Sequence, residues 1–220
     1  MQDLTVTTGM IIKTEPIGDF DRRLVILTKE RGKITAFVKG ARRPNSRFVA
    51  STNLFCFGTF RLYEGRTAYT LNEAEITNYF EELRGDFEGA YYGMYFLEIA
   101  DYYTRENNDE RQMLKLLYQS LRALGAKGLD NRLVRCIFEI KTTVINGEFP
   151  GIPSDREWQE STKYAVSFIE HTGVEKLFTF TVKQNILEEL EKIAGRTREK
   201  CMDAHFKSLE ILDTFRIYST

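Results

Sequence analysis

The first 80 residues form short runs in which apolar and polar positions alternate, the pattern of half-buried β-strands. Between positions 33 and 39, every even position is apolar and falls on one face, whereas Lys33, Phe37 and Lys39 share the other. Five strands are expected, at residues 4–13, 23–28, 33–39, 55–63 and 69–76. Five short strands in this length predict a small closed barrel of the OB type, with a five-stranded SH3-like barrel as the competing structure.

Local features refine this barrel. Gly9, in the middle of the first strand, predicts a bend or bulge where the barrel turns. Residues 30–32, Glu-Arg-Gly, predict a short hairpin loop between the second and third strands. In the fourth strand, Phe55 is expected on the face opposite to Cys56.

Beyond the strands, apolar residues recur at helical spacing. The first helix is expected to end near Tyr103, with a buried stripe of Phe87, Ala90, Tyr91, Met94, Leu97 and Tyr102. A second stripe at positions 113–124 stops at Gly125. Asp130 is expected to cap a third helix, which ends at Asn146-Gly147 before a proline-containing loop.

The C-terminal third predicts further helices. Residues 154–157 form a capping-box pattern, and Thr181 with Gln184 forms a second one, with a short extended piece at 178–180 between them. Gly195 is expected to interrupt the helical pattern before a last helix. The sequence thus predicts an α+β protein, with a barrel domain at 1–80 and a helical bundle domain at 81–220, packed as one rigid body.

Charge is distributed unevenly along the chain. The net charge is −1, but eleven basic and only two acidic residues lie between Arg22 and Arg66. The remainder holds 20 basic and 30 acidic residues. Such an asymmetry favours a nucleic-acid or anionic-membrane surface on the cationic part. An ordinary solvated loop is the simpler interpretation.

The basic charge is densest in residues 36–48, which contain no acidic residue. Gly40 and Pro44 exclude a regular element there, so the segment is expected to be an exposed loop that can pair with phosphates. The cations assigned to this contact are Lys33, Lys39, Arg42, Arg43 and Arg47. Phe37 shares the face of Lys33 and is assigned either to base stacking or to burial against the helical domain.

More peripheral contacts are assigned to Arg22, Arg23 and Arg66, and Arg61 is considered as a structural partner of Glu64. The tyrosines of the first helix, at positions 91, 92, 95, 102 and 103, are interpreted mainly as core and domain packing.

Bulk composition narrows the class of protein. A hydrophobic fraction of 42% is that of an ordinary globular protein, and no stretch approaches the length of a membrane span. The first residues lack the features of a signal peptide, so a cytosolic protein is expected. Three widely spaced cysteines, at 56, 136 and 201, suit reduced thiols.

The sequence offers little for an enzyme. It has two histidines, and we find no P-loop, no Gly-x-Ser-x-Gly and no His-Glu-x-x-His motif. A non-catalytic RNA-binding OB protein is the main alternative to a DNA-binding one. A protein whose basic loop docks an acidic partner is the third possibility.

Several segments together resemble the bacterial recombination mediator RecO family. The strongest part is Asp21 to Thr28, Gly32-Lys33, and Lys39 to Arg43 followed by Ser46-Arg47-Phe48. The likeness continues through residues 64–66 and 72–75, and more loosely through helix 91–103 and residues 145–150, so that it covers nearly the whole chain.

The resemblance implies an OB-fold domain, a helical domain and no catalytic centre. It also implies binding of single- and double-stranded DNA and annealing of complementary strands in the bacterial cytoplasm, near the nucleoid. The implied partners are RecR, with which the family loads RecA onto gapped DNA, and the acidic C-terminal tail of single-stranded DNA-binding protein. No cofactor and no membrane contact are implied.

One departure from the family is visible. Many members carry a four-cysteine zinc module after the proline-containing turn, but this chain has no Cys-x-x-Cys pair. Cys201 and His205 are spaced i, i+4 on an expected helix, which is too few ligands for a structural zinc site. We therefore expect no zinc, with residues 154–181 in the place of the module and Cys201 as a semi-buried helix thiol.

Overall fold

The computed structural model describes the backbone of residues 4–218 and the side chains of residues 4–215. The chain divides into two compact units. The barrel unit comprises Met1–Glu81 and Ala100–Leu114, and the helical unit comprises Glu82–Ile99 and Lys115–Thr220. Residues 100–114, which lie far beyond the strands in sequence, therefore belong with the barrel.

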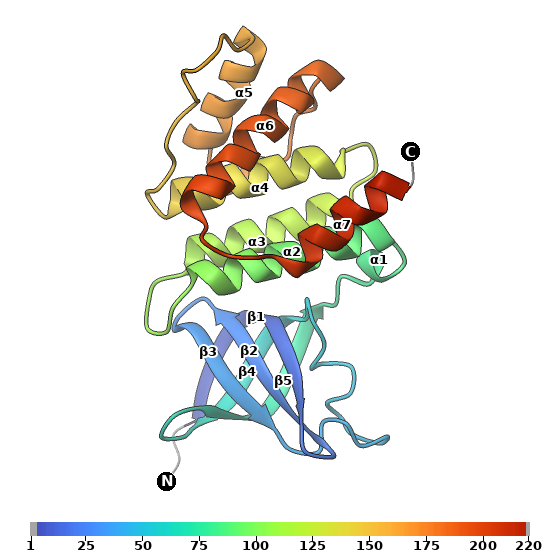
Figure 1. Cartoon of the computed structure of the whole chain (residues 1–220). Helices are drawn as coiled ribbons and strands as arrows, with labels where there is room; N and C mark the ends of the chain where they lie inside the picture. The colour runs from blue at the N-terminus through green and yellow to red at the C-terminus, as the bar shows by residue number, and fades with distance from the viewer. Residues whose placement is uncertain (1–3, 219–220) are drawn as a thin grey trace. The chain divides into compact units, whose positions relative to one another are not determined.

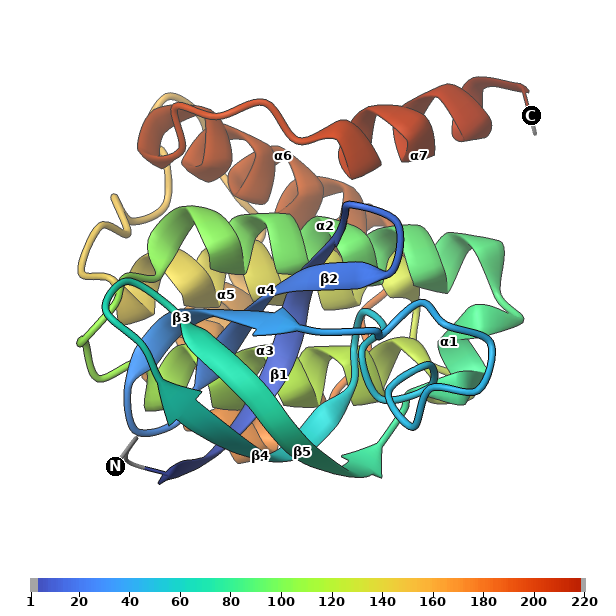
Figure 2. The ribbon, with the colours of Figure 1, turned by 90° about the horizontal axis from the view of Figure 1, so that it is seen from below.

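The barrel unit contains five strands, β1 (Leu4–Ile17), β2 (Asp21–Thr28), β3 (Gly32–Val38), β4 (Phe57–Glu64) and β5 (Tyr69–Asn78). They form a closed ring in the order β1-β2-β3-β5-β4 (Figures 1 and 2). All neighbouring strands are antiparallel except β3 and β5, which pair in parallel at Ala36↔Tyr69 and Phe37↔Thr70. This order, with a parallel closing pair, is that of an OB-fold barrel, so the OB prediction is confirmed.

The alternation predicted for β3 is confirmed. Ile34, Ala36 and Val38 are buried in the barrel core, and the residues between them point outward. Phe55, however, was wrongly placed on the face opposite to Cys56, because it lies before β4 with φ 71° and is itself buried. Its backbone N–H donates to Ile11 O at 3.1 Å, which turns the chain into β4 two residues later than expected.

Two glycines allow close backbone approaches in the barrel unit. A Cβ at Gly9 would lie 2.5 Å from Leu27 O, and the β1–β2 register shifts nearby, between Ile11 and Lys13. Gly32 closes the β2–β3 hairpin with φ +65°, and a Cβ there would lie 2.3 Å from Arg105 O. Both positions therefore exclude a side chain.

The helices are α1 (Glu81–Arg84), α2 (Phe87–Tyr103), α3 (Arg111–Leu124), α4 (Asn131–Ile145), α5 (Glu160–His171), α6 (Gln184–Cys201) and α7 (Lys207–Tyr218), with a 3₁₀ turn η1 (Val174–Lys176). In the helical unit, α4 packs against both α5 and α6. The extended piece expected at 178–180 is instead a turn and an irregular segment after η1.

Helix α2 ends at Tyr103 as predicted, but most of its predicted buried stripe is wrong, because only Leu97 of the six stripe residues is buried. Phe87 is 48% exposed, and Ala90, Tyr91 and Met94 are only partly buried. The fully buried residues of α2 are instead Tyr92, Tyr95, Phe96, Ile99 and Ala100. Apolar residues surround this helix, so spacing alone could not identify its inner face.

Helix α4 agrees with the sequence at both ends. The Asp130 carboxylate accepts a hydrogen bond from the Arg132 N–H at 2.8 Å, as expected for an N-cap. Asn146 caps the other end, and Gly147 follows with φ +72°. Its central residues, from Leu133 to Thr143, are all buried.

Neither capping box predicted for the C-terminal third forms. Helix α5 begins at Glu160, well after Ser154, because Trp158 is buried and its indole Nε1 donates to Pro153 O at 2.6 Å. Helix α6 begins at Gln184, and its N-cap residue Lys183 makes no side-chain capping bond. A tertiary contact of Trp158 therefore holds the segment before α5, and the predicted cap of α6 is absent.

The predicted break at Gly195 is also wrong, since α6 continues to Cys201. The break lies at residues 202–206, so Cys201 and His205 do not share a helix. The Cys201 thiol donates to Glu148 O at 3.4 Å, and His205 Nε2 lies 2.9 Å from a Glu210 carboxylate oxygen.

Residues 4–218 contain neither a membrane-spanning helix nor a cluster of metal-binding side chains. No helix in this part of the chain combines the length and apolar character needed to cross a bilayer. Within the same residues, no three His, Cys, Asp or Glu side chains gather in a way that could hold a metal ion.

Candidate nucleic-acid interface

The basic loop between β3 and β4 is an ordered chain of turns. The N–H groups of Arg43, Ser46 and Val49 each donate to the carbonyl three residues earlier, at 3.0–3.2 Å. Beneath the loop, Ala41 is fully buried and Phe48 packs against the barrel core. The loop therefore has an apolar underside that fixes its backbone, while its charged side chains face outward.

Arg22 fastens the far end of this loop. Its Nη1 lies within hydrogen-bonding distance of Thr52 O (3.0 Å), Thr52 Oγ1 (2.8 Å) and Asn53 Oδ1 (3.0 Å). A guanidinium group engaged in this way is a structural support. Its position at the start of β2, opposite Val38, explains why it can reach the loop.

The near end of the loop is bound to the β1–β2 turn. Gly40 N–H donates to the Asp21 carboxylate at 2.7 Å, and Arg42 N–H donates to Phe20 O at 2.8 Å. The Arg42 side chain also donates to Gly18 O at 3.3 Å. The turn and the loop therefore form one continuous surface, which also includes one exposed carboxylate, Asp19.

Four exposed cations make up what we call the loop surface: Lys39, Arg42, Arg43 and Arg47. Within the described residues, none of the four forms an ion pair with a carboxylate. Arg47 donates to Asn72 O at 2.6 Å, and the guanidinium carbons of Arg43 and Arg47 lie 5.3 and 4.8 Å from the rings of Phe20 and Phe48. These partners are neutral, so the positive charge is not compensated.

The structure does not bring all the predicted residues to the loop surface. The Lys33 ammonium group pairs with the Asp101 carboxylate at 2.9 Å and donates to Asp101 O at 2.6 Å, with 22% of the side chain exposed. Arg23 pairs with Glu15 at 2.9 Å. Their charges are therefore locally balanced, unlike those of the loop surface.

Three further predictions concern exposed positions. Phe37 is 40% exposed on β3, which leaves its ring open to solvent. Arg66 is exposed in the bend between β4 and β5. The pairing considered between Arg61 and Glu64 is wrong: Arg61 pairs with Glu73 at 3.1 Å, and Arg31 lies 3.4 Å from Glu64.

Sequence reasoning missed Phe20 altogether. This residue ends the β1–β2 turn, 47% exposed, with Arg43 over its ring. An aromatic residue directly after Gly18-Asp19 could have been noticed as an unusual turn residue, but only the fold places it beside the basic loop.

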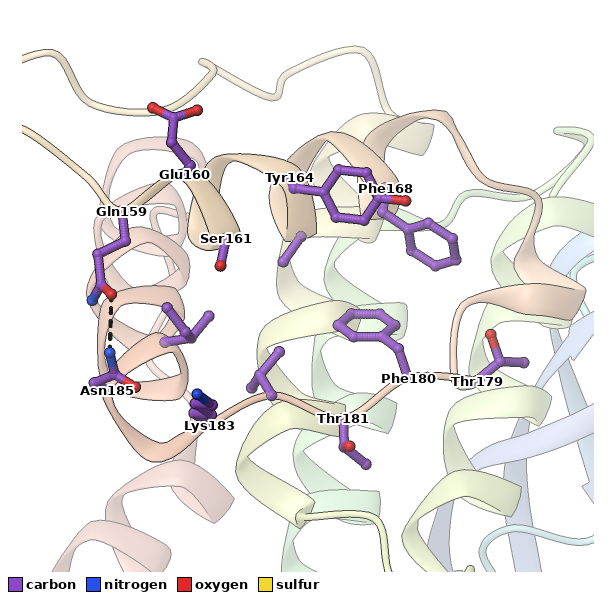
Figure 3. Close-up of a pocket in the computed structure, with 13 residues that line it drawn as sticks. Gln159, Glu160, Ser161, Tyr164, Phe168, Thr179, Phe180, Thr181, Lys183 and Asn185 are labelled. Atoms are coloured by element: carbon purple, nitrogen blue, oxygen red, sulfur yellow. Dashed lines mark hydrogen bonds between the residues drawn. The ribbon is translucent and has the colours of Figure 1, made fainter.

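A separate groove of about 760 Å³ lies in the helical unit. Figure 3 shows Tyr164 and Phe168 of α5 on one side, and Phe180 and Lys183, from the segment that leads into α6, on the other. The rings of Phe168 and Phe180 meet edge to face at 5.2 Å, and Tyr164 is 74% exposed. Neither α5 nor α6 has a side-chain cap at its start, so this groove combines aromatic surface with helix N-termini.

Comparison with known proteins agrees with this architecture. A family model described as Recombination protein O N terminal matches residues 1–80, and one described as Recombination protein O C terminal matches residues 84–152. The DNA repair protein RecO of Acetivibrio thermocellus is 28% identical over 240 aligned positions, which cover 94% of this chain and 96% of the relative. That alignment is longer than the chain, so the relative carries residues that have no counterpart here.

Two other relatives named DNA repair protein RecO are similar. The protein of Alkaliphilus metalliredigens is 31% identical, over 84% of this chain and 77% of the relative. That of Clostridium novyi is 27% identical, over 94% and 93% respectively. Together with the OB barrel and the helical unit, these matches show that the chain belongs to the RecO family of DNA repair proteins.

Proposed function

We propose that this protein is a non-catalytic mediator of recombinational DNA repair that binds single- and double-stranded DNA through the loop surface. Family membership supports the repair role. The observation that carries the binding role is the set of four exposed, uncompensated cations on an ordered loop. Each phosphate contact releases counterions, so affinity falls with rising salt.

Annealing of complementary strands follows from the same surface. Two single strands repel each other because both are polyanions, and bound cations screen that repulsion. The side chains of the loop surface need to hold only the sugar-phosphate backbone, which leaves base edges free to pair. No side chain has to react.

The proposal includes three protein partners taken from the resemblance to the family: RecR, RecA as the protein that is loaded, and the acidic tail of single-stranded DNA-binding protein. The groove in the helical unit is our candidate site for that tail. Its aromatic lining suits apolar side chains, and Lys183 with the uncapped start of α6 suits a carboxylate. The proposed location is the bacterial cytoplasm at the nucleoid, where the DNA lies.

An RNA-binding OB protein is the alternative, since phosphate contacts do not distinguish the two nucleic acids. Annealing of complementary DNA oligonucleotides, compared with binding to RNA hairpins, separates the two functions. Stronger binding to hairpins without DNA annealing would favour the alternative.

The decisive experiment removes three charges from the loop surface by Arg42→Ala, Arg43→Ala and Arg47→Ala together. We expect weaker binding to a single-stranded oligonucleotide and a salt dependence reduced by roughly 0.7 in log–log slope for each lost phosphate contact. The melting temperature should stay close to that of the wild type, because exposed loop charges contribute little to folding.

The matched control removes the same charge from the helical unit, at the exposed residues Arg122, Lys127 and Lys192. This variant should bind DNA nearly as well as the wild type. Equal affinity of the loop variant and the wild type at moderate salt would refute the assigned surface.

A further inference from the structure

An exposed aromatic side chain, that of Phe20, lies beside the cations of the loop surface. Phe20 lies 47% exposed at the end of the β1–β2 turn, outside the barrel core. The bond from Arg42 N–H to Phe20 O fixes the turn against the basic loop. The apolar side chain of Phe20 is therefore fixed in a solvent-exposed position beside Arg42 and Arg43.

The side chain of Arg43 lies over the ring of Phe20. The Arg43 guanidinium carbon lies 5.3 Å from the ring centroid, and Arg43 itself is exposed. Its backbone is fixed by the turn to Gly40, but its side chain forms no ion pair within residues 4–218. An exposed cation–π pair is weak, because water competes for the cation.

Phe20 is well placed for a nucleic-acid base. The β1–β2 loop is one of the loops through which OB barrels bind oligonucleotides, and bases stack on aromatic rings whatever their sequence. Phe37, an exposed aromatic residue of β3, lies opposite Arg23 of β2 within the strands. Phe20 differs because it lies directly beside uncompensated arginines.

We propose that Phe20 is a base-stacking residue for single-stranded DNA, and that Arg43 covers its ring only in the free protein. When a strand binds, a base takes the place of the guanidinium over the ring, and Arg43 turns to a phosphate. The exchange replaces a solvated cation–π contact by a stacked base and a charge-assisted phosphate contact. The inference rests on the proposed DNA-binding function.

Stacking of a base on Phe20 discriminates between single-stranded and double-stranded DNA. In a duplex the bases are already stacked and paired, so Phe20 has no free base face to cover. The cations of the loop surface contact both forms of DNA, whereas Phe20 contributes to single strands alone. The turn therefore gives this surface a preference for unpaired DNA that phosphate contacts cannot supply.

The test compares Phe20→Ala and Phe20→Leu with the wild-type protein on three probes of equal length. These are a mixed-sequence single strand, the same sequence as a duplex, and a single strand of abasic sites. Both variants should bind the single strand roughly five- to a hundredfold more weakly. They should bind the duplex and the abasic strand as the wild type does, with an unchanged salt slope.

Two further variants complete the test. Phe20→Trp should keep the affinity, and the fluorescence of the new indole should be quenched by the single strand and not by the abasic one. Val6→Ala, which removes another exposed apolar side chain of the barrel, should change no affinity. Phe20→Leu keeps an apolar side chain, so it answers the question even if the alanine variant is poorly folded.

The possible failures are distinct. If the wild type binds single-stranded DNA and Phe20→Leu binds it equally well, the stacking role is wrong and the DNA-binding function stands. Equal losses on all three probes would also overturn stacking. If the wild type binds none of the probes, the proposed function itself fails.

Discussion

A single buried carboxylate, Glu139, organises the interior of the helical unit. It is fully buried on α4, and its Oε1 accepts hydrogen bonds from the Tyr95 hydroxyl at 2.5 Å and from Arg198 Nη1 at 3.2 Å. The guanidinium of Arg135 lies 3.8 Å away. One side chain thus joins α2, α4 and α6, and removing it would leave the buried Arg135 and the partly buried Arg198 less well paired.

Burial also holds protons on two neighbours of this cluster. Desolvation, followed by the charge of Glu139, raises the pKa of Tyr95 well above its ordinary value of 10.0. Desolvation likewise raises the pKa of the buried Cys136 thiol above its ordinary value of 9.0. The folded state therefore keeps both protons at pH values where the unfolded state loses them.

We predict that the free energy of unfolding falls as the pH rises above about 9. Its slope approaches about 1.4 kcal/mol per pH unit for each group that is deprotonated only when unfolded. Urea unfolding between pH 7 and 11 measures this. Cys136→Ala should flatten the fall, and Cys201→Ala, at a half-buried site, should leave most of it. A stability independent of pH over this range would contradict the prediction.

At the scale of single residues, the sequence identifies the exposed cations of the loop surface, but it does not identify the cations that are bound to distant partners. Residues 36–48 hold no acid, which is a local property, so the exposure of Arg42, Arg43 and Arg47 was predictable. Lys33 and Arg22 find partners 68 and 30 residues away along the chain. Only the fold brings such partners together, and the same holds for Phe20 beside Arg43.

At the scale of elements, α5 depends on a lysine from α4. The Lys141 ammonium group is buried and donates to Ile169 O at 3.0 Å, Glu170 O at 2.8 Å and Thr172 O at 2.8 Å. These carbonyls lie at the C-terminal end of α5, where no helical N–H is available to them. Lys141 therefore ends α5 and attaches it to α4.

We predict that Lys141→Met lowers the free energy of unfolding by about 1.5–3 kcal/mol, the range for hydrogen bonds to a charged group. Methionine keeps the aliphatic bulk and removes the three bonds. Chemical denaturation measures the loss, and amide hydrogen exchange should locate it at the end of α5. Lys163→Met, at a partly exposed residue of α5, is the control and should change stability by less than about 0.5 kcal/mol. Equal stability of both variants would rule out the capping role.

Element boundaries were predictable where the signal is local. Asp130 and Asn146-Gly147 set both ends of α4 from within the adjoining turns. The capping pattern at 154–157 failed because its residues make distant contacts instead, such as Asp155 with Arg196 at 2.7 Å. Gly195 failed as a break because its modest cost is outweighed by the burial of neighbouring α6 residues such as Ile193 and Ala194.

At the scale of the whole molecule, the two proposed binding functions belong to different units. The loop surface lies in the barrel unit, and the aromatic groove lies in the helical unit. The barrel and the helical part were both predictable from the change in hydrophobic period. The membership of residues 100–114 in the barrel unit was not, because it depends on contacts such as Lys33 N–H to Arg105 O at 3.0 Å.

We predict that the two functions can be removed separately. Tyr164→Ala combined with Lys183→Ala should weaken binding of a fluorescent peptide that carries the acidic tail of single-stranded DNA-binding protein. The same variant should bind a single-stranded oligonucleotide with wild-type affinity. The triple arginine variant of the loop surface should show the reverse. Unchanged peptide affinity in the groove variant would show that the tail binds elsewhere.

The closing pair of the barrel has a consequence for biosynthesis. β3 pairs with β5 at two residue pairs, and β5 ends at Asn78, 40 residues after the end of β3 at Val38. A nascent chain that has released β1 to β3 from the ribosome therefore carries two open sheet edges, which can pair with other chains. The ring is sealed only when Asn78 has emerged, so translation pauses before that point are the moment of greatest aggregation risk.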